Sequence, residues 1–271
     1  MKSIYGLLGE SLGHSFSPQI HREIFIKLGT TGEYKLFELK EAELGSALLE
    51  YKAQGIRGLN VTVPYKIKIM AFLDMISEEA EKIGAVNTIG FNNGILTGYN
   101  TDYHGFGMSL KKSRIEVAGK HAVILGTGGV SKAVVQYLED NGAAGMTFIS
   151  RNPAGGAKGY DKLSGLGGDI IINCTPCGMY PGTGVSPVEA AVLKNFDTAI
   201  DLIYNPEKTL FLKHAEECGL KTVNGLYMLV SQAVAAQEIW SGVKLEEAQV
   251  DEIYQRIRKL LYKADAGRQH D

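Results

Sequence analysis

The organisation of this chain follows from one stretch, His121-Ala-Val-Ile-Leu-Gly-Thr-Gly-Gly129. Apolar residues Ala122 to Leu125 enter the glycine turn, and apolar residues at helical spacing follow it. This order predicts a buried strand, a tight turn and a helix, an arrangement whose free backbone N–H groups bind phosphate at the helix N-terminus. Because the turn begins so far into the 271 residues, we expect residues 1–103 to form a separate domain ahead of it.

Composition and charge argue against nucleic acid and membranes as binding partners. The formal net charge is −2 at pH 7, and the charged residues are dispersed rather than gathered in runs. Such a chain lacks the basic surface that attracts nucleic acid or an anionic membrane. No stretch approaches the roughly 18 apolar residues of a membrane span, and no signal-peptide pattern precedes the first expected strand. We expect a soluble, cytoplasmic protein with a small-molecule substrate and no nucleic-acid or membrane partner, and we leave a homodimer open.

The cysteines do not indicate a disulfide framework or a metal centre. The chain has 3 of them, an odd number in a long sequence, which is typical of a reducing compartment. Cys174 and Cys177 have the spacing of redox and zinc motifs, but no second Cys or His pair lies near them in the sequence. We expect no redox role for this pair and no metal site.

The first hundred residues alternate between strand and helix patterns. Ser17 and Pro18 predict a helix start, because serine caps helix N-termini and proline fits the first turn. Asn93-Gly94 favours the positive φ values of a type I′ turn and so predicts a hairpin over residues 88–98. Further strands are expected over residues 4–8, 34–39 and 58–63, with helical turns over 41–51 and up to about 83. We therefore predict an α/β domain with a mixed sheet.

From residue 121 onward, short apolar strands alternate with helices. We expect strands over residues 121–125, 146–149, 170–173, 198–203 and 221–223, and helices over 129–140 and 207–218. This alternation is typical of a doubly wound parallel sheet.

The fold predicted for the whole chain is α/β. An N-terminal substrate-binding domain with a mixed sheet is expected over residues 1–103, and a Rossmann-like domain with a doubly wound parallel sheet, which binds a dinucleotide, over 104–225. Helices in about 226–263 are expected to complete the first domain. The apolar face of the last helix comprises Val250, Ile253, Ile257, Leu260 and Leu261.

The strand after the glycine turn ends in Ile149-Ser-Arg-Asn152, at the position that distinguishes NAD from NADP. In NAD-binding chains an acidic side chain accepts a hydrogen bond from the ribose 2′-hydroxyl, and this stretch has none. Arg151 instead provides a planar cation that pairs with a 2′-phosphate or stacks on adenine. We therefore predict NADP as the cofactor. The residues expected to contact it are Gly126, Thr127, Gly128, Gly129, Val130, Ser150, Arg151, Asn152 and Gly225.

Two serines stand two residues apart after the first expected strand. In an extended chain, residues at this spacing project to the same side, so the hydroxyls of Ser15 and Ser17 are able to donate to one carboxylate. A second interpretation is structural, with Ser17 as the helix cap and Ser15 as a turn residue. Taken alone, the two serines leave both interpretations open.

Further polar motifs follow strands in both halves of the chain. They are His14-Ser-Phe-Ser-Pro18, Asn60-Val-Thr-Val-Pro-Tyr-Lys66, Gly84-Ala-Val-Asn-Thr88, Asn100-Thr-Asp102, Asn173-Cys-Thr-Pro-Cys-Gly-Met179, Asp201-Leu-Ile-Tyr204 and Gly225-Leu-Tyr-Met-Leu-Val-Ser-Gln232. Together with the Gly-Thr-Gly-Gly turn, this set resembles, in kind and in order, the motifs of the shikimate dehydrogenase family. The resemblance spans nearly the whole chain and favours the serines as carboxylate ligands.

The resemblance implies an NADP-dependent oxidoreductase that interconverts 3-dehydroshikimate and shikimate in the route to the aromatic amino acids. It implies that Lys66 and Asp102 are the catalytic pair. It assigns the substrate carboxylate to Ser15 and Ser17 with Thr62 and Tyr204 nearby, and the ring hydroxyls to Asn87, Asp102 and Gln232. The chain departs from the family pattern at Thr127, at Cys174 and in Ser150-Arg-Asn152, where Asn-Arg-Thr is frequent.

The chemistry of such a reaction explains why a lysine and an aspartate are needed. Hydride transfer to a ketone develops negative charge on the carbonyl oxygen, which must receive a proton at or near the transition state. A cationic Lys66 stabilises that oxygen and donates the proton. A nearby Asp102 orients the lysine and helps to keep its ammonium charged.

Three alternatives stay open on the sequence. A quinate/shikimate dehydrogenase that uses NAD would have the same substrate site, although the absence of an acid at Ser150 and Arg151 argues against NAD. A non-catalytic module that binds shikimate or NADP would lose the proton donor, whereas Lys66 and Asp102 are both present. A reductase of the same architecture that acts on another ring acid is also consistent with the paired serines.

Overall fold

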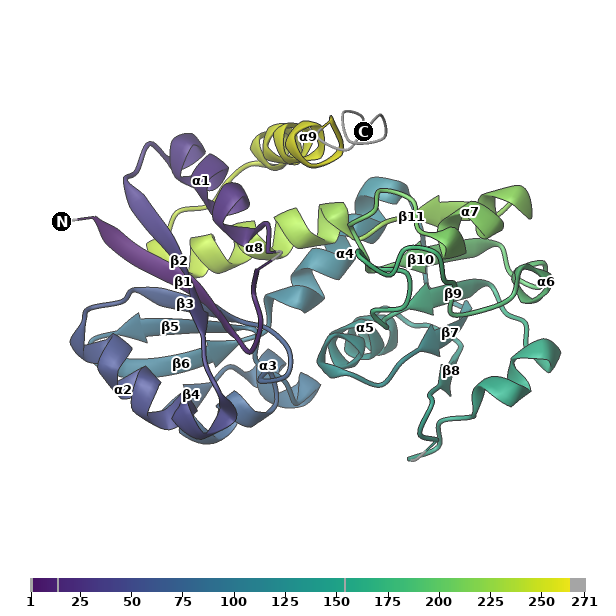
Figure 1. The fold of residues 1–271 in the computed structure, drawn as a ribbon, viewed down its shortest axis with the longest axis horizontal. Coiled ribbons are helices and arrows are strands. Elements are labelled where there is room, and N and C mark those ends of the chain that lie inside the picture. The colour runs from purple at the N-terminus through teal and green to yellow at the C-terminus, as the bar shows by residue number, and fades with distance from the viewer. Residues whose placement is uncertain (1, 14, 154, 264–271) are drawn as a thin grey trace. The chain divides into compact units, whose positions relative to one another are not determined.

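The structure, a computed structural model, describes residues 2–13, 15–153 and 155–263, so His14 of the first serine motif lies outside the described residues. The chain forms two compact units, each with its own sheet (Figure 1). The first unit holds the described residues up to Gly105 together with Val230–Ile257, and the second holds Phe106–Leu229 together with the described residues after Ile257. The chain therefore leaves the first unit after Gly105, returns to it at Val230 and leaves it again after Ile257.

The first unit is built on a mixed sheet, as predicted. Its strands are β1 (Ser3–Gly9), β2 (Gly32–Glu38), β3 (Gly58–Val61), β4 (Met75–Ile76), β5 (Thr88–Asn92) and β6 (Ile95–Tyr99). Within the described residues their order is β2-β1-β3-β5-β6-β4. β1 is parallel to β2 and β3, and β6 is parallel to β4, whereas β5 is antiparallel to both of its neighbours. The hairpin β5–β6 turns at Asn93 and Gly94, which both have positive φ.

Helices from both ends of the chain belong to the first unit. They are α1 (Ser17–Leu28), α2 (Leu44–Ala53), α3 (Glu78–Ile83), the start of α4 (Thr101–Ser113), most of α8 (Leu226–Ser241) and most of α9 (Glu247–Lys263), with the 3₁₀ turns η1 (Glu41–Glu43) and η2 (Lys68–Phe72). Trp240 of α8 lies so close to Gly58 of β3 that a side chain at Gly58 would overlap the indole. The indole N–H donates to the carbonyl of Ile89 at 2.9 Å, and this contact anchors α8 on the sheet.

The second unit is built on a parallel, doubly wound sheet, as predicted. Its strands are β7 (His121–Leu125), β8 (Gly145–Ile149), β9 (Ile170–Asn173), β10 (Thr198–Asp201) and β11 (Lys221–Val223), and its helices include α5 (Gly129–Asp140), α6 (Ala190–Leu193) and α7 (Leu210–Glu217), with the 3₁₀ turn η3 (Tyr160–Gly165). The strand order is β11-β10-β9-β7-β8. The order reverses between β7 and β9, and ligands of such sheets bind at the carboxyl ends of the strands at this reversal.

Both faces of the second sheet are covered. Val123 of β7 belongs to one core cluster with Phe211 of α7, whereas its neighbour Ile124 belongs to another with Phe106 of α4 and Leu138 of α5. Successive side chains of a strand point to opposite faces, so the two clusters lie on the two faces of the sheet. Because both faces are buried, the strand is a continuous apolar run rather than an alternating one.

Several element boundaries differ from the sequence predictions. Ser17 does not cap α1: it is the first helical residue, and the Ser15 hydroxyl accepts its backbone N–H at 3.3 Å. The helix predicted over 207–218 begins at Leu210, because the Thr209 side chain accepts from the N–H of Leu212 and caps it there. Leu260, predicted on the apolar face of α9, is 54% exposed.

Other differences concern short elements. The sequence analysis did not predict β4, α6 or η3, which have 2, 4 and 6 residues and are too short to show a period. The strand predicted over 58–63 ends at Val61, and the one over 198–203 ends at Asp201. The first strand stops directly before the polar residue Thr62, and the second has the carboxylate Asp201 as its last residue.

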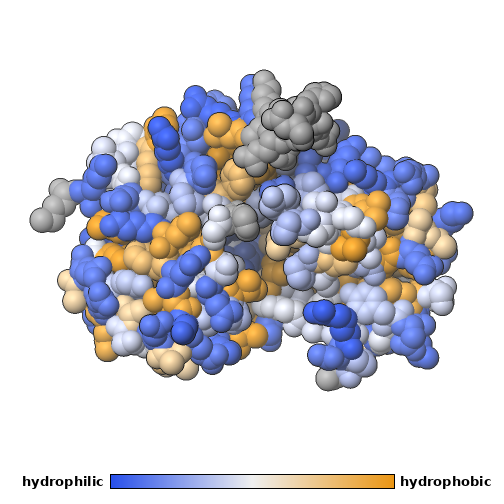
Figure 2. All heavy atoms as spheres, viewed as in Figure 1, coloured by the Kyte–Doolittle hydropathy of each residue, from blue (hydrophilic) through white to orange (hydrophobic). Residues whose placement is uncertain are grey.

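Hydrophilic and hydrophobic residues are mixed on the surface. On the face shown in Figure 2, groups of hydrophobic residues are interspersed among hydrophilic ones. Within the part of the chain that the structure describes, no helix combines the length and the apolar character needed to cross a membrane.

Candidate active site

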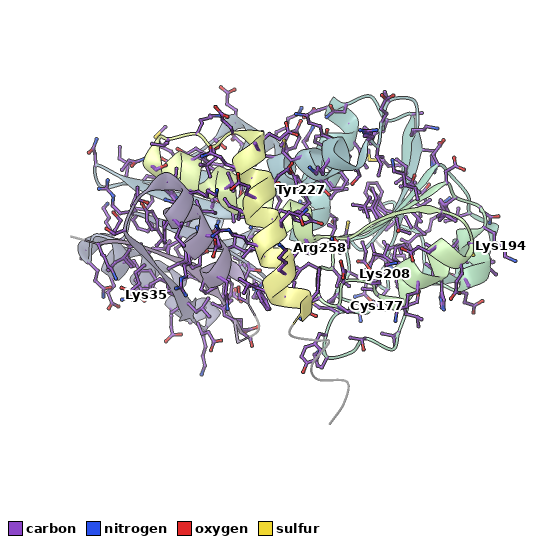
Figure 3. All side chains as sticks on the ribbon, turned by 90° about the horizontal axis from the view of Figure 1, so that it is seen from above. Lys35, Cys177, Lys194, Lys208, Tyr227 and Arg258 are labelled. Carbon is purple, nitrogen blue, oxygen red and sulfur yellow. The ribbon has the colours of Figure 1, made fainter. Side chains whose placement is uncertain are left out.

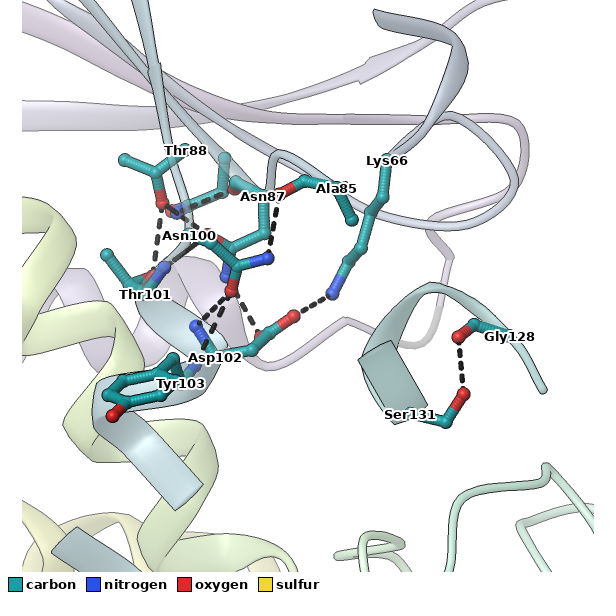
Figure 4. A network of polar contacts seen from close by, with 11 residues as sticks. Lys66, Ala85, Asn87, Thr88, Asn100, Thr101, Asp102, Tyr103, Gly128 and Ser131 are labelled. Carbon is teal, nitrogen blue, oxygen red and sulfur yellow. Dashed lines mark hydrogen bonds and ion pairs between the residues drawn. The ribbon is translucent and has the colours of Figure 1, made fainter. Parts of the chain in front are cut away.

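Lys66 and Asp102 form an ion pair inside the first unit (Figure 4). Lys66 Nζ lies 2.6 Å from Asp102 Oδ2, and the two side chains are 13% and 7% exposed. The Lys66 carbonyl accepts the N–H of Val86 at 2.7 Å, which fixes the loop after β3 against the segment before β5. The pair predicted from the sequence therefore joins the loop after β3 to the first turn of α4 (Thr101–Ser113).

Asp102 is held from its backbone as well as from its carboxylate. It is the second residue of α4, whose N-terminus favours a negative charge through the helix dipole. Asn100 caps this helix, because its Oδ1 accepts the N–H groups of Asp102 at 3.1 Å and Tyr103 at 3.4 Å. The Asn100 amide nitrogen donates to the carbonyl of Ala85 at 2.8 Å. The start of α4 is thus fixed on the loop that precedes β5.

Asn87 holds the second oxygen of Asp102. Its Nδ2 donates to Asp102 Oδ1 at 2.9 Å, and its Oδ1 accepts the N–H of Thr101 at 2.7 Å. Because a backbone N–H only donates, the oxygen of the amide must face Thr101 and the nitrogen must face Asp102. Asp102 therefore receives Lys66 on one oxygen and Asn87 on the other.

Ser15 and Ser17 lie side by side, with their hydroxyl oxygens 3.2 Å apart. Ser17 is 8% exposed, and its side chain contacts Tyr34. Burial raises the pKa of Tyr34, and the contact with Ser17 lowers it. The Tyr34 hydroxyl donates to Asn60 Oδ1 at 2.7 Å. The serines therefore belong to a buried polar network rather than to an isolated turn.

This network continues from Asn60 to the ion pair. Asn60 Nδ2 donates to the Thr88 hydroxyl at 3.0 Å, and the Thr88 hydroxyl donates to Asn87 Oδ1 at 3.0 Å. A chain of hydrogen bonds thus links Ser17 with Asp102 through Tyr34, Asn60, Thr88 and Asn87. All of its members lie in the first unit.

Thr62 and Gln232 also lie in the first unit. Thr62 is half-buried, and its methyl group packs over Gly9 at the end of β1, where a side chain at Gly9 would meet it at 2.7 Å. Gln232 is half-buried on α8 between Ser231 and Ala233, which are buried. Tyr204, the remaining substrate-binding candidate, belongs to the second unit, and its carbonyl accepts the Tyr262 hydroxyl at 2.6 Å.

The glycine turn connects β7 with α5, as predicted. Gly126 has a φ of +100°, which only glycine adopts readily, and a side chain there would meet Thr175 at 2.9 Å. Gly128 occupies the cap position of α5, and its carbonyl accepts the Ser131 hydroxyl at 2.6 Å (Figure 4). A side chain at Gly128 would meet nothing within 4 Å. Open space therefore borders the first N–H groups of a 12-residue helix, where phosphate binds favourably.

Ser150, Arg151 and Asn152 follow β8. Ser150 is 9% exposed, and its hydroxyl accepts the N–H of Asn152 at 3.3 Å, while Arg151 is exposed. The sequence analysis missed Lys158, whose backbone pairs with this stretch: its N–H donates to Phe148 and its carbonyl accepts from Ser150. Lys158 therefore adds a second cation near the end of β8. No sequence motif around Lys158 predicts this position.

Gly225, predicted to contact the cofactor, has a packing role in the structure. Its N–H donates to the carbonyl of Ile203 at 3.0 Å. A side chain at this position would overlap the carbonyl of Leu202. The close approach of two backbones therefore requires glycine there whether or not a ligand binds.

The cysteine pair has the environment of inert thiols. Cys174, Cys177 (Figure 3) and Cys218 are free. Burial raises the pKa of Cys174 and Cys177, and the negative charge of Asp201 raises both further. Neutral thiols are poor nucleophiles and poor metal ligands. In addition, the described residues hold no cluster of three or more His, Cys, Asp or Glu side chains able to bind a metal.

A surface pocket of about 570 Å³ lies at the opposite edge of the second sheet, where β7, β9, β10 and β11 begin. Three of its charged groups are engaged within the protein: Lys120 pairs with Asp169, and Lys221 donates to the carbonyl of Arg114. Because ligands of open parallel sheets bind at the carboxyl ends, the glycine turn is the better candidate.

Comparisons with known proteins bear on the family of this chain. A family model described as the shikimate dehydrogenase substrate binding domain matches residues 7–89. A protein of Clostridium perfringens (strain 13 / Type A) named shikimate dehydrogenase (NADP(+)) is 42% identical over 266 residues, which cover 94% of this chain and 98% of that protein.

Two solved structures extend the comparison. A chorismate mutase/shikimate 5-dehydrogenase fusion protein from Clostridium acetobutylicum is 50% identical, with a TM-score of 0.93 over 96% of this chain and 99% of that one. Shikimate 5-dehydrogenase from Thermus thermophilus, solved in complex with NADP(H) and shikimate, is 31% identical, with a TM-score of 0.84 over 94% of this chain and 99% of that one.

Proposed function

This chain belongs to the shikimate dehydrogenase family, and we propose that it reversibly reduces 3-dehydroshikimate to shikimate with NADPH, with Lys66 and Asp102 as the catalytic pair. The observation that carries the proposal is the 2.6 Å ion pair between these two residues. We assign substrate binding to residues 1–103 with helices in about 226–263, and NADP binding to residues 104–225. Cytoplasmic location and a homodimer stay predictions.

The second unit offers chemistry that fits NADP. The N–H groups at the start of α5 border open space at Gly128, as pyrophosphate binding requires. Arg151 is exposed at the end of β8 without an acid beside it in the sequence, and Lys158 adds a second cation there. A 2′-phosphate is favoured by such cations and repelled by the acid of NAD-binding chains. When bound, NADPH supplies the hydride.

The protein itself supplies the proton for the reaction and positions the group that donates it. We propose that the Lys66 ammonium donates a hydrogen bond to the carbonyl oxygen of the substrate, stabilises the charge that develops there and then transfers the proton to it. Asp102 keeps Lys66 in place and, with Asn87 and Gln232, binds the ring hydroxyls. Because Asn87 fixes the other oxygen of Asp102 at 2.9 Å, the carboxylate is oriented before the substrate arrives.

The substrate carboxylate is assigned to the hydroxyls of Ser15 and Ser17, with Thr62 and Tyr204 nearby. The two serine oxygens are 3.2 Å apart, close enough for both hydroxyls to donate to one carboxylate. The Tyr34 hydroxyl gives its proton to Asn60, so Ser17 donates to Tyr34 in the structure. To donate to a substrate carboxylate, the Ser17 hydroxyl must rotate away from Tyr34.

Absorbance of reduced nicotinamide tests the proposal. Purified protein should reduce NADP in the presence of shikimate, and it should do so with a higher kcat/KM than with quinate or with NAD. Preference for NAD and quinate would replace the proposal with a quinate/shikimate dehydrogenase. Tight binding of shikimate or NADP without turnover would indicate a non-catalytic module.

A further inference from the structure

The carboxylate at the carboxyl end of β10 is buried, and the residues that the structure describes place no cation beside it. Asp201 is fully buried. Its Oδ1 accepts Asn173 Nδ2 at 3.0 Å and the N–H of Ile203 at 3.1 Å, and its Oδ2 accepts the Thr209 hydroxyl at 2.6 Å. Among the described residues, none forms an ion pair with Asp201, and the groups that lower its pKa are these neutral donors. Removing a carboxylate from water is costly unless such donors replace the water.

The donors to Asp201 come from separate segments. Asn173 ends β9, and its Oδ1 accepts both the N–H of Thr175 at 3.0 Å and the Thr175 hydroxyl at 2.6 Å. Ile203 belongs to the loop after β10, and Thr209 ends this loop by capping α7. Asp201 therefore ties the turn after β9, the loop over residues 202–209 and the start of α7 to one point.

The two segments that Asp201 joins carry groups of the proposed site. The loop over residues 202–209 carries Tyr204, and the carbonyl of Ile203 accepts the N–H of Gly225 at 3.0 Å. The turn after β9 places Thr175 against Gly126 of the glycine turn, since a side chain at Gly126 would meet the Thr175 methyl group at 2.9 Å. One carboxylate thus supports a substrate-binding loop and a neighbour of the cofactor turn.

We propose that Asp201 is a positioning residue, which fixes the 202–209 loop and thereby sets the affinity of the enzyme for the substrate carboxylate. This inference rests on the proposed function, because that function assigns Tyr204 to the carboxylate. Asp201 itself does not touch the reacting atoms. Its effect should therefore fall on KM for shikimate rather than on kcat.

The negative charge of Asp201 strengthens these contacts. A hydroxyl-to-carboxylate distance of 2.6 Å is typical of a charge-assisted hydrogen bond. Burial raises the pKa of Asp201 to about 7. The titratable groups that face it are the thiols of Cys174 and Cys177, which stay neutral in this range because burial raises their pKa as well. The hydrogen bonds that Asp201 accepts should therefore become stronger between about pH 6 and pH 8, as its carboxyl group loses its proton.

The substitution Asp201→Asn tests the proposal with little change of shape. The new Oδ1 is able to accept from Asn173 and Ile203, but the new amide nitrogen faces Thr209 and accepts nothing. At pH 8 we expect KM for shikimate to rise about five- to tenfold, with kcat within about twofold of the wild type. At pH 6, where the wild-type carboxylate is largely protonated, the ratio of KM values should approach one.

Two companion variants and one control sharpen the experiment. Thr209→Ser keeps the hydroxyl and should behave as the wild type, whereas Thr209→Val should raise KM for shikimate as Asp201→Asn does. Asp197→Asn changes an exposed carboxylate just before β10 and should leave both constants unchanged. Binding of 2′,5′-ADP reports the cofactor half of the unit and should stay within twofold in every variant.

Two results would overturn the inference while the wild type still turns over shikimate. One is an unchanged KM in Asp201→Asn at pH 8. The other is a parallel loss of 2′,5′-ADP binding, which would indicate general destabilisation. If the wild type itself fails to turn over shikimate, the proposed function fails separately. Hydrogen exchange then still tests whether Asp201 fixes the loop over residues 202–209. Faster exchange of the Ile203 amide in Asp201→Asn supports that role, and unchanged exchange refutes it.

Discussion

Asp102 in the first unit and Asp201 in the second are both buried carboxylates, 5% and 0% exposed, but different groups compensate their charge. Asp102 receives the Lys66 ammonium at 2.6 Å, whereas the donors to Asp201 within the described part of the chain are the neutral groups of Asn173, Ile203 and Thr209. A carboxylate that is paired with a partly exposed cation orients this cation as a proton donor. A carboxylate that accepts hydrogen bonds from neutral donors fixes the backbone segments that carry these donors. We propose that the same type of side chain serves chemistry in the first unit and positioning in the second.

The difference in exposure also predicts which step each carboxylate affects. Lys66 is 13% exposed at its side chain, and under the proposed function its ammonium, oriented by Asp102, is the group that contacts the substrate. Asp201 has no exposed surface, so its effects must travel through the loop that it fixes. Substitutions in the two units should therefore separate chemistry from positioning.

Removal of the Lys66 ammonium should abolish the chemistry while leaving binding largely intact. For Lys66→Ala we expect kcat to fall about 10³-fold, within the range of general acid catalysis, and KM for shikimate to change less than tenfold. Steady-state assays at saturating NADP measure both. Lys68→Ala is the matched control, because Lys68 pairs with Glu41 on the exposed surface and should retain wild-type kinetics. A Lys66→Ala variant with kcat within a few fold of wild type would remove Lys66 from the mechanism.

Charge reversal at Arg151 should affect the second unit alone. Arg151→Asp places an acid where NAD-binding chains have one, so kcat/KM for NADP should fall about 100-fold while that for NAD changes less than about threefold. Lys194→Asp, an exposed site beyond α6, is the control and should change neither. Equal losses for both cofactors would contradict the assignment of Arg151 to the 2′-phosphate.

The uncompensated charge of Asp201 should also appear in stability. Its pKa is raised from the ordinary 3.8 to about 7 in the folded protein, so between these values the folded state binds more protons than the unfolded state. Stability from this group is therefore present at low pH and lost as pH rises through 7. Asn does not titrate, so Asp201→Asn should gain about 2 kcal/mol relative to wild type between pH 5 and pH 8. Urea denaturation at the two pH values measures this, and a constant difference would refute it.

A weaker effect is expected within the network of the first unit. Tyr34→Phe removes the donor to Asn60 and the partner of Ser17, so KM for shikimate should rise about threefold to fivefold with kcat nearly unchanged. Tyr51→Phe, at a tyrosine that packs against Phe37 in the same unit, is the control. If Tyr34→Phe matched Tyr51→Phe in both constants, the network would not reach the serines.

Long periodic patterns in the sequence predicted much of the fold. The strand and helix around Gly126 are where the sequence placed them, because a buried apolar run and a glycine with positive φ leave few other arrangements. Short elements such as β4 were missed, because two residues show no period. Ser17 was misjudged as a cap, because the sequence does not show that the Ser15 hydroxyl accepts the N–H there.

The candidate site was predictable as a set of residues and not as a network. Lys66 and Asp102 were paired by resemblance, but 36 positions separate them, and only the fold shows that they meet. Asn60 and Asp201 stood in quoted motifs without a role, because a polar residue at a strand end has no partner in the sequence. Tyr34 looked like a strand residue and gave no signal of its buried hydrogen bond.

The division between the two carboxylates is tested most directly by the rate of hydride transfer in a single turnover, measured for Asp102→Asn and Asp201→Asn side by side at saturating shikimate. We predict that Asp102→Asn slows this step at least about 100-fold, because the ammonium loses the carboxylate that orients it. Asp201→Asn should leave the step within about twofold of wild type, since saturation compensates a weaker substrate loop. Equal slowing in both variants, or an unchanged rate in Asp102→Asn, would contradict the assignment of one carboxylate to chemistry and the other to positioning.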